Sequence, residues 1–158
     1  MNSRWLMLML PFSATLNAGT TVPPPAIDDF LYAIRQVESG DRYDGPAGPG
    51  GELGPYQFRR SVWHQYTEAP FSGARTAMAD DIARKHFWRI VQGLTVHGVT
   101  PSAWNIAAAW NGGCRAVISG RIPRSTRDYA GRVVNLTEYA AGMHGTRPSP
   151  TAAALAVR

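Results

Sequence analysis

Glu38 is the residue whose position most clearly suggests chemistry. It stands at the end of a segment, residues 27–38, in which Ile27, Leu31 and Ile34 recur at helical spacing. At ~100° per residue, Glu38 falls within roughly 40° of this apolar stripe. A carboxylate that borders an apolar, partly dry cleft has a raised pKa, which suits a general acid near neutral pH. The alternative is an ordinary helix-end carboxylate that turns to solvent or pairs with an arginine.

The next segment, residues 41–53, predicts a loop, because six of its thirteen residues are glycine or proline. A loop placed directly after Glu38 can line a cleft rather than merely connect two elements. It carries Asp44 and Glu52 as candidate second carboxylates. A carboxylate that faces the cleft can activate a water molecule, whereas one that faces outward is simply solvated.

The elements that must position these groups are helices. A short apolar segment, residues 61–66, is followed by a long helix whose spaced apolar positions are Ala79, Ala83, Phe87, Ile90 and Leu94. Residues 102–111 are alanine-rich and apolar on nearly all sides, which predicts a helix buried in the middle of the domain. Four or five helices with little strand signal predict a mainly α, single-domain fold.

The expected helix ends follow from capping residues. Thr100 is placed as the N-cap of the buried helix, with Pro101 at its first position, and Gly112 ends it. Ser125 or Thr126 can cap a last helix. The apolar stripe of that helix is Tyr129, Val133, Leu136 and Ala140.

Composition limits the possible partners and cofactors. The net charge of +5 comes almost entirely from arginine, which favours an anionic partner. No basic run or nucleic-acid motif occurs, so we expect no nucleic-acid partner. Cys114 is the only cysteine, and His86 and His97 lack matching ligands. We therefore expect surface or core histidines, no metal site and no cofactor.

The two ends read as segments outside the folded domain. Residues 1–18 combine a short positive start, an apolar run and small residues, which is typical of a secretory signal peptide. Residues 19–26 form a proline-rich spacer, and residues 143–158 read as a disordered tail. We expect a periplasmic or secreted protein with no stable membrane span.

Four short motifs occur in order along the chain: Glu38-Ser39-Gly40, Gly54-Pro55-Tyr56-Gln57-Phe58, Ala108-Ala109-Trp110-Asn111-Gly112-Gly113 and Thr126-Arg127-Asp128-Tyr129. Together they resemble the lysozyme-like lytic transglycosylases of the soluble-lytic-transglycosylase type. The second motif and the Asn-Gly-Gly triplet also resemble invertebrate-type lysozymes. The resemblance extends over residues 27–140, and it implies a lysozyme-like catalytic domain at residues 27–142.

The resemblance implies a role for each matching residue. Glu38 would protonate the glycosidic oxygen and then act as the base. Ser39 would orient Glu38 or contact the sugar, or else only end its helix. The other implied substrate contacts are Tyr56 and Gln57 in the groove, Asn111 at the end of the buried helix, and the Tyr129 hydroxyl near the cleaved sugar. For Tyr56 the alternative is core packing, and for Tyr129 it is a place in the apolar stripe.

The implied activity is cleavage of the MurNAc-GlcNAc β-1,4 bond in peptidoglycan glycan strands by a monomeric enzyme. Lytic transglycosylases use a single glutamate, helped by the 2-acetamido group of the substrate, and form a 1,6-anhydro product. Two alternatives stay open. One is a hydrolytic muramidase that uses Asp44 or Glu52 as its second carboxylate, and the other is a glycan-binding module without turnover.

Overall fold

The computed structural model describes residues 23–145, and the prediction of a mainly α protein is confirmed for them. They contain no strand, and their β-pairing is confined to an isolated bridge between Leu53 and Phe58. The elements in chain order are α1 (Ile27–Ser39), α2 (Arg60–Trp63), the 3₁₀ helix η1 (Phe71–Arg75), α3 (Met78–Thr95), α4 (Ala103–Gly112), α5 (Cys114–Ile118) and α6 (Arg124–Gly145). The expected signal peptide, residues 1–18, lies outside the described residues.

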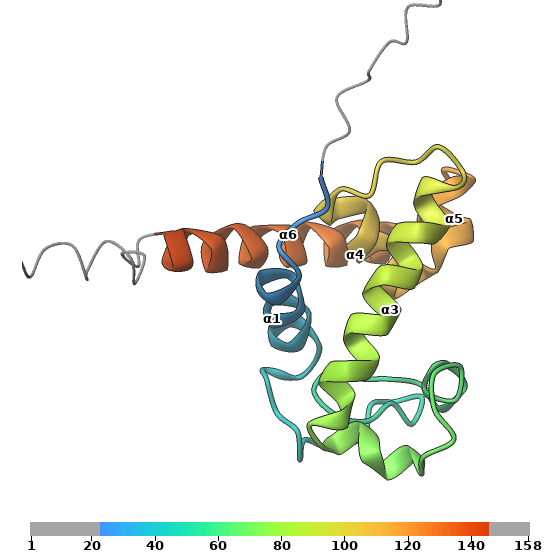
Figure 1. The fold of residues 1–158 in the computed structure, drawn as a ribbon, viewed down its shortest axis with the longest axis vertical. Coiled ribbons are helices and arrows are strands. Elements are labelled where there is room, and N and C mark those ends of the chain that lie inside the picture. Colours follow the sequence, from blue (N-terminus) through green and yellow to red (C-terminus); the bar gives the residue numbers. More distant parts are fainter. Residues whose placement is uncertain (1–22, 146–158) are drawn as a thin grey trace, which may run out of the picture.

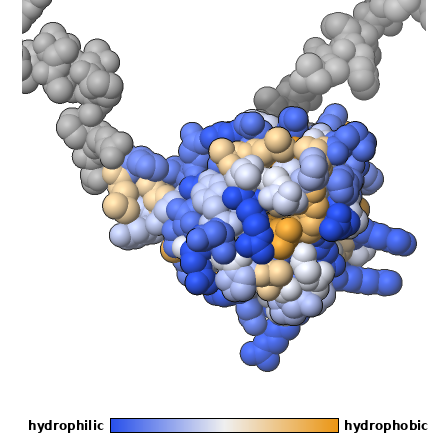
Figure 2. Space-filling view, turned by 90° about the horizontal axis from the view of Figure 1, so that it is seen from below, coloured by the Kyte–Doolittle hydropathy of each residue, from blue (hydrophilic) through white to orange (hydrophobic). Residues whose placement is uncertain are grey.

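The helices pack around α4 and α6. Helix α6 runs across both α1 and α4 (Figure 1). One end of α3 lies near α4, and its other end lies beside the segment that connects α1 to α3. The core is apolar and rich in aromatic rings, and Phe30, Trp63 and Phe87 are fully buried in it. The face seen from below is mostly hydrophilic around a compact apolar area (Figure 2). None of the helices in residues 23–145 is both long and apolar enough to cross a bilayer.

Helix α1 places Glu38 in its last turn. Asp28 and Asp29 occupy the first turn, where a negative charge interacts favourably with the helix dipole. At the other end Gly40 adopts a left-handed conformation, with φ of 65°. The amide of Gly40 donates to the carbonyl of Gln36, which satisfies an end carbonyl and turns the chain sharply into the loop.

Helix α4 is buried as expected, but its cap differs from the prediction. Ala107 and Ala108 are fully buried. The N-cap is Ser102, whose hydroxyl accepts from the amide of Asn105 at 3.2 Å, and not Thr100. Ser102 has the extended backbone of an N-cap, with ψ of 160°, and its hydroxyl reaches a free amide of the first turn, so the helix begins two residues later than predicted.

Helix α6 also begins differently from the prediction. Its first hydrogen bond runs from the amide of Arg127 to the carbonyl of Pro123, so Ser125 and Thr126 lie inside the first turn and do not cap it. The predicted stripe is confirmed, with Tyr129, Val133 and Ala140 buried and Leu136 packed against the core. The helix continues to Gly145, so residues 143–145 belong to it and not to a tail.

The short helix α5 was not expected from the sequence. It spans only five residues, too few for an apolar repeat to develop. Gly113, with φ of 83°, separates it from α4 and lets the chain change direction there.

Candidate active site

A cleft of about 770 Å³ lies beside the end of α1. It is lined by Glu38, by the loop and turn that follow α1, by His86 of α3 and by the C-terminal end of α4. Its lining residues are Glu38, Pro49, Gly50, Glu52, Tyr56, Gln57, Phe58, Arg59, Val62, His86 and residues 109–113.

Glu38 is held in this cleft by a residue of the last helix. The Tyr129 hydroxyl donates to Oε1 of Glu38 at 2.8 Å. Burial raises the pKa of Glu38 to about 7 against the opposing effects of this hydrogen bond and of Arg132, and the charge of Glu52 raises it further. Near neutral pH the side chain therefore holds a proton in a large share of molecules. A carboxyl with this pKa can act both as an acid and as a base.

Tyr129 belongs to the apolar stripe, and its hydroxyl meets Glu38, but it is not among the residues that line the cleft. Its ring is buried, with the side chain only 5% exposed, and it belongs to the apolar stripe of α6. Burial and the neighbouring Glu38 raise the pKa of its hydroxyl well above the ordinary value. Tyr129 therefore keeps its proton and acts as a fixed hydrogen-bond donor to Glu38.

Glu52 is the second carboxyl in the cleft. Its Oε1 lies 3.2 Å from Nε of Arg59, and its Oε2 accepts from the amide of Gly50 at 2.8 Å. Hydrogen bonds from its own amide and that of Gly50, together with Arg59, hold its pKa below the ordinary value. The cleft thus contains one carboxyl with a raised pKa, Glu38, and one with a lowered pKa, Glu52. Such a difference allows the first to act as an acid and the second as a base.

Asp44 does not join this pair. Its side chain is exposed, and it is absent from the residues that line the cleft and the adjoining smaller pocket. Glu52 follows a turn in which the amide of Gly48 donates to the Glu52 carbonyl at 2.9 Å. Of the two candidate second carboxylates, the structure places Glu52 alone in the cleft.

Gln57 lies at the tip of a tight turn. Its backbone is left-handed, with φ of 46°, and its Nε2 donates to the carbonyl of Gly54 at 3.0 Å. A methyl group at Gly48 would lie 2.6 Å from Oε1 of Gln57 and 2.5 Å from Oε2 of Glu52. A methyl group here would displace the ends of both side chains, because the loop passes directly against them.

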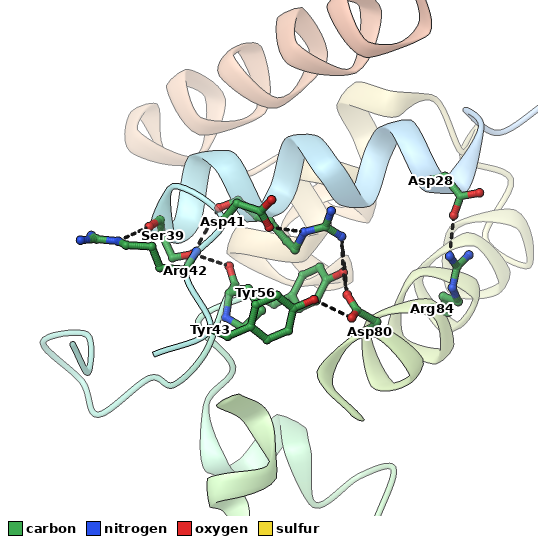
Figure 3. Close-up of polar contacts among 10 residues, drawn as sticks. Asp28, Ser39, Asp41, Arg42, Tyr43, Tyr56, Asp80 and Arg84 are labelled. Atoms are coloured by element: carbon green, nitrogen blue, oxygen red, sulfur yellow. Dashed lines mark hydrogen bonds and ion pairs between the residues drawn. The ribbon is translucent and has the colours of Figure 1, made fainter. Parts of the chain in front are cut away.

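Tyr56 lines the cleft with its ring but directs its hydroxyl away into a polar network. The hydroxyl donates to Asp80 at 2.6 Å and accepts from Arg35 at 3.0 Å. Tyr43 donates to the other oxygen of Asp80, and Arg35 also binds Asp41 (Figure 3). The Tyr56 side chain is only 1% exposed. Its geometry is that of an anchor between the turn, α1 and α3, in agreement with the packing alternative.

Ser39 and Asn111 each form a hydrogen bond beside the cleft. The Ser39 hydroxyl donates to the carbonyl of Pro55 at 3.0 Å, which ties α1 to the turn that carries Gln57. Ser39 also lines a pocket of about 130 Å³ that shares Glu38 and Gln57 with the main cleft. The Asn111 side chain is exposed in the cleft, and its Oδ1 accepts from Thr126 at 2.8 Å. Within the part of the chain that the structure describes, its amide nitrogen makes no hydrogen bond to protein.

Sequence reasoning missed the apolar part of the lining. His86, Trp110, Phe58 and Val62 all border the cleft. The expectation that His86 is a surface or core residue overlooked this position. Trp110 directly precedes Asn111, which the sequence places in the cleft. This adjacency is the signal that could have identified Trp110 as a lining residue. Within residues 23–145, no group of three or more potential ligands could hold a metal ion.

A comparison with models of known protein families finds no match to this chain, and comparisons with curated proteins and with solved structures find none either. The functional assignment therefore depends on the chemistry of the cleft and on the motifs in the sequence.

Proposed function

We propose that the protein is an exported enzyme with a lysozyme-like fold, which cleaves the MurNAc-GlcNAc β-1,4 bond of peptidoglycan as a lytic transglycosylase. The observation that carries the proposal is the state of Glu38. Its carboxyl lies in a cleft of about 770 Å³, bound by Tyr129, with a pKa raised to about 7. These are the properties that a general acid for a glycosidic oxygen requires at neutral pH.

The proposed reaction begins with protonated Glu38. It donates its proton to the glycosidic oxygen as the bond to the anomeric carbon breaks, and the carbonyl oxygen of the 2-acetamido group stabilises that carbon. The Glu38 carboxylate then removes the proton from the C6 hydroxyl of the same sugar, whose oxygen forms the 1,6-anhydro bond. The hydrogen bond from Tyr129 stabilises the carboxylate between these two steps.

A hydrolytic muramidase is the second candidate, and the position of Glu52 favours it. Glu52 borders the same cleft, and its lowered pKa keeps it ionised. In this alternative Glu52 directs a water molecule to the anomeric carbon, and the product has a reducing end. The two candidates share Glu38 and differ in the nucleophile.

Mass spectrometry of muropeptides released from purified sacculi tests both candidates. We expect 1,6-anhydro ends from the natural protein and almost none from the Glu38→Gln variant. The matched control is Glu138→Gln, which removes an exposed carboxylate on α6 and should leave turnover unchanged. Reducing ends would favour the muramidase. Binding of sacculi without any released product would indicate the glycan-binding module instead, and full activity of Glu38→Gln would refute the role of Glu38.

A further inference from the structure

Positive charge is concentrated in one stretch of the chain. Between Asp81 and Asp128 the sequence contains seven lysines and arginines and no acidic residue. These seven charges exceed the net charge of +5 of the whole chain, so the remaining residues are acidic on balance. The stretch covers most of α3, all of α4 and α5, and the first residues of α6. Its surface therefore attracts a negatively charged partner.

The exposed side of α3 combines these charges with large apolar groups. Lys85, Trp88, Arg89 and Val96 follow one another at intervals that place them on one side of the helix. Lys85 and Arg89 are exposed, and Trp88 and Val96 are 52% and 69% exposed. None of the ion pairs formed within residues 23–145 involves Lys85 or Arg89. This side of α3 therefore presents charge that no carboxylate neutralises, next to apolar area in contact with water.

Helix α5 extends this surface. It lies beside the C-terminal end of α3 (Figure 1), and a methyl group on Gly93 would lie 3.5 Å from Sγ of Cys114, the first residue of α5. Gly93 comes one helical turn after Arg89, so α5 adjoins the side of α3 on which Arg89 lies. Arg115 is exposed, and Ile118, on the same side of α5, is 37% exposed. We call the combined surface the α3–α5 face and define it as Lys85, Trp88, Arg89, Val96, Arg115 and Ile118.

We infer that the α3–α5 face docks on an anionic lipid membrane. Three of the six large apolar side chains that are exposed in residues 23–145 lie on this face. A soluble polyanion would neutralise the cations but leave these apolar groups in water. A bilayer interface accepts both kinds of group, because lipid phosphates attract the cations and the headgroup region takes up Trp88, Val96 and Ile118. The docking is peripheral, since no helix of the described residues can cross a bilayer.

Docking in this way leaves the cleft open. His86 comes two residues before Trp88, so the two side chains leave α3 in directions about 160° apart. His86 borders the cleft, whereas Trp88 is part of the α3–α5 face. A membrane that covers the face therefore does not cover the cleft. The inference goes beyond the proposed function and does not depend on the role of Glu38.

Co-sedimentation with vesicles tests the docking. We expect the protein to bind phosphatidylcholine vesicles that contain about 30% phosphatidylglycerol much more tightly than pure phosphatidylcholine vesicles, and added salt to weaken this binding. Lys85→Gln combined with Arg115→Gln should weaken it about 25-fold, or about five-fold for each charge removed. The matched control is Arg59→Gln combined with Arg60→Gln, which removes the same charge at the start of α2, in the segment beside the N-terminal end of α3 (Figure 1). The control should bind like the natural protein. All variants have the same chain ends, so any contribution of the ends cancels in the comparison.

Trp88→Ala distinguishes a membrane from a soluble polyanion. We expect this variant to bind the anionic vesicles about ten-fold more weakly and to bind polyphosphate as the natural protein does. An equal loss in the two double variants would show that total charge alone drives binding, and would refute the face. Vesicle binding that Trp88→Ala leaves unchanged, or that inorganic phosphate abolishes, would assign the face to soluble phosphates and also overturn the proposal. Equal binding of the natural protein to both kinds of vesicle would refute it without any variant. None of these readouts measures wall cleavage, which the sacculus digestion tests on its own.

Discussion

The Tyr129 hydroxyl donates a 2.8 Å hydrogen bond to Oε1 of Glu38 across 91 residues of sequence. The first and last helices of the described chain thereby meet at a single carboxyl. This bond opposes the effect of burial on the pKa of Glu38, so its removal should raise that pKa.

Tyr129→Phe keeps the buried ring and removes only the hydroxyl. The charged form of Glu38 loses a donor, so its pKa should rise above about 7 and the alkaline limit of activity should move upward with it. We expect kcat to fall about ten-fold, since a hydrogen bond to a charged group contributes ~1.5 kcal/mol. The pH profile of sacculus digestion, with ¹³C titration of Glu38, measures both effects. An unshifted titration curve would show that the bond has no influence on the acid.

Glu52→Gln separates electrostatics from nucleophile activation. The negative charge of Glu52 raises the pKa of Glu38, so its removal should lower that pKa and move the alkaline limit downward. A transglycosylase should keep activity below this limit, whereas a muramidase should lose ~100-fold or more in kcat at every pH. Asp44→Gln, at the exposed loop carboxylate, is the control. Rates and product ends measured from pH 4 to 9 distinguish the two cases.

Glu38→Gln should stabilise the fold at neutral and alkaline pH. The pKa of Glu38 is raised from 4.5 to about 7 in the folded protein, so its contribution to stability is fully present below pH 4.5 and is lost as the pH rises through 7. Glutamine avoids this loss. We expect the variant to exceed the natural protein by about 2 to 3 kcal/mol in free energy of unfolding at pH 8. Urea unfolding at pH 8 and pH 4 provides the comparison, and an equal gain at both would contradict the assignment to ionisation.

Tyr56→Phe distinguishes an anchor from a sugar contact. The change leaves Asp80 without one donor and Arg35 without one acceptor in the network beside α1. We expect the free energy of unfolding to fall by about 1 to 3 kcal/mol. Well below the unfolding temperature KM should stay within about two-fold, because the hydroxyl is already bound to Asp80 and Arg35. A large rise in KM without loss of stability would restore the substrate role.

Gly48→Ala tests how closely the loop is fitted to the cleft. The new methyl would meet Glu52 and Gln57 at 2.5 and 2.6 Å, so both side chains must move. We expect at least a ten-fold loss of kcat/KM with a change below ~1 kcal/mol in stability, because the loop is largely exposed. Gly131→Ala on α6, where the added methyl meets no atom within 4 Å, is the matched control. Equal activity of the two variants would show that the loop adapts without consequence.

Local spacing was sufficient to predict the long helices and the inward position of Glu38. The apolar stripe through Ile34 is a property of one helix, and the alanine content of α4 directly reflects its burial. The cap of α4 was harder to predict, because Thr100 and Ser102 have similar intrinsic preferences for an N-cap, and only the structure shows that the Ser102 hydroxyl makes the bond. The mainly α class and the position of Glu38 beside the apolar stripe were therefore predictable from short-range patterns.

The remaining parts of the site depend on contacts between distant residues. The hydroxyl of Tyr56 is turned away from the cleft by Arg35 and Asp80, which lie 21 and 24 residues away. His86 reaches the cleft because α3 passes beside Trp110 of α4, and no spacing within α3 encodes that crossing. Asp44 and Glu52 could not be ranked from the loop sequence, because the position of Glu52 depends on its contacts with Gly50 and Arg59.

The hydrogen bond between Tyr129 and Glu38 bears on when, during synthesis of the chain, the site becomes complete. Residue 38 emerges early from the ribosome and residue 129 late, so the acid lacks its partner until almost the whole domain has been made and α6 has packed. If the chain is exported as proposed, a molecule still threading through the export channel carries an unfinished site. Wall cleavage would then start only after release, which protects the secreting cell while the enzyme is in transit.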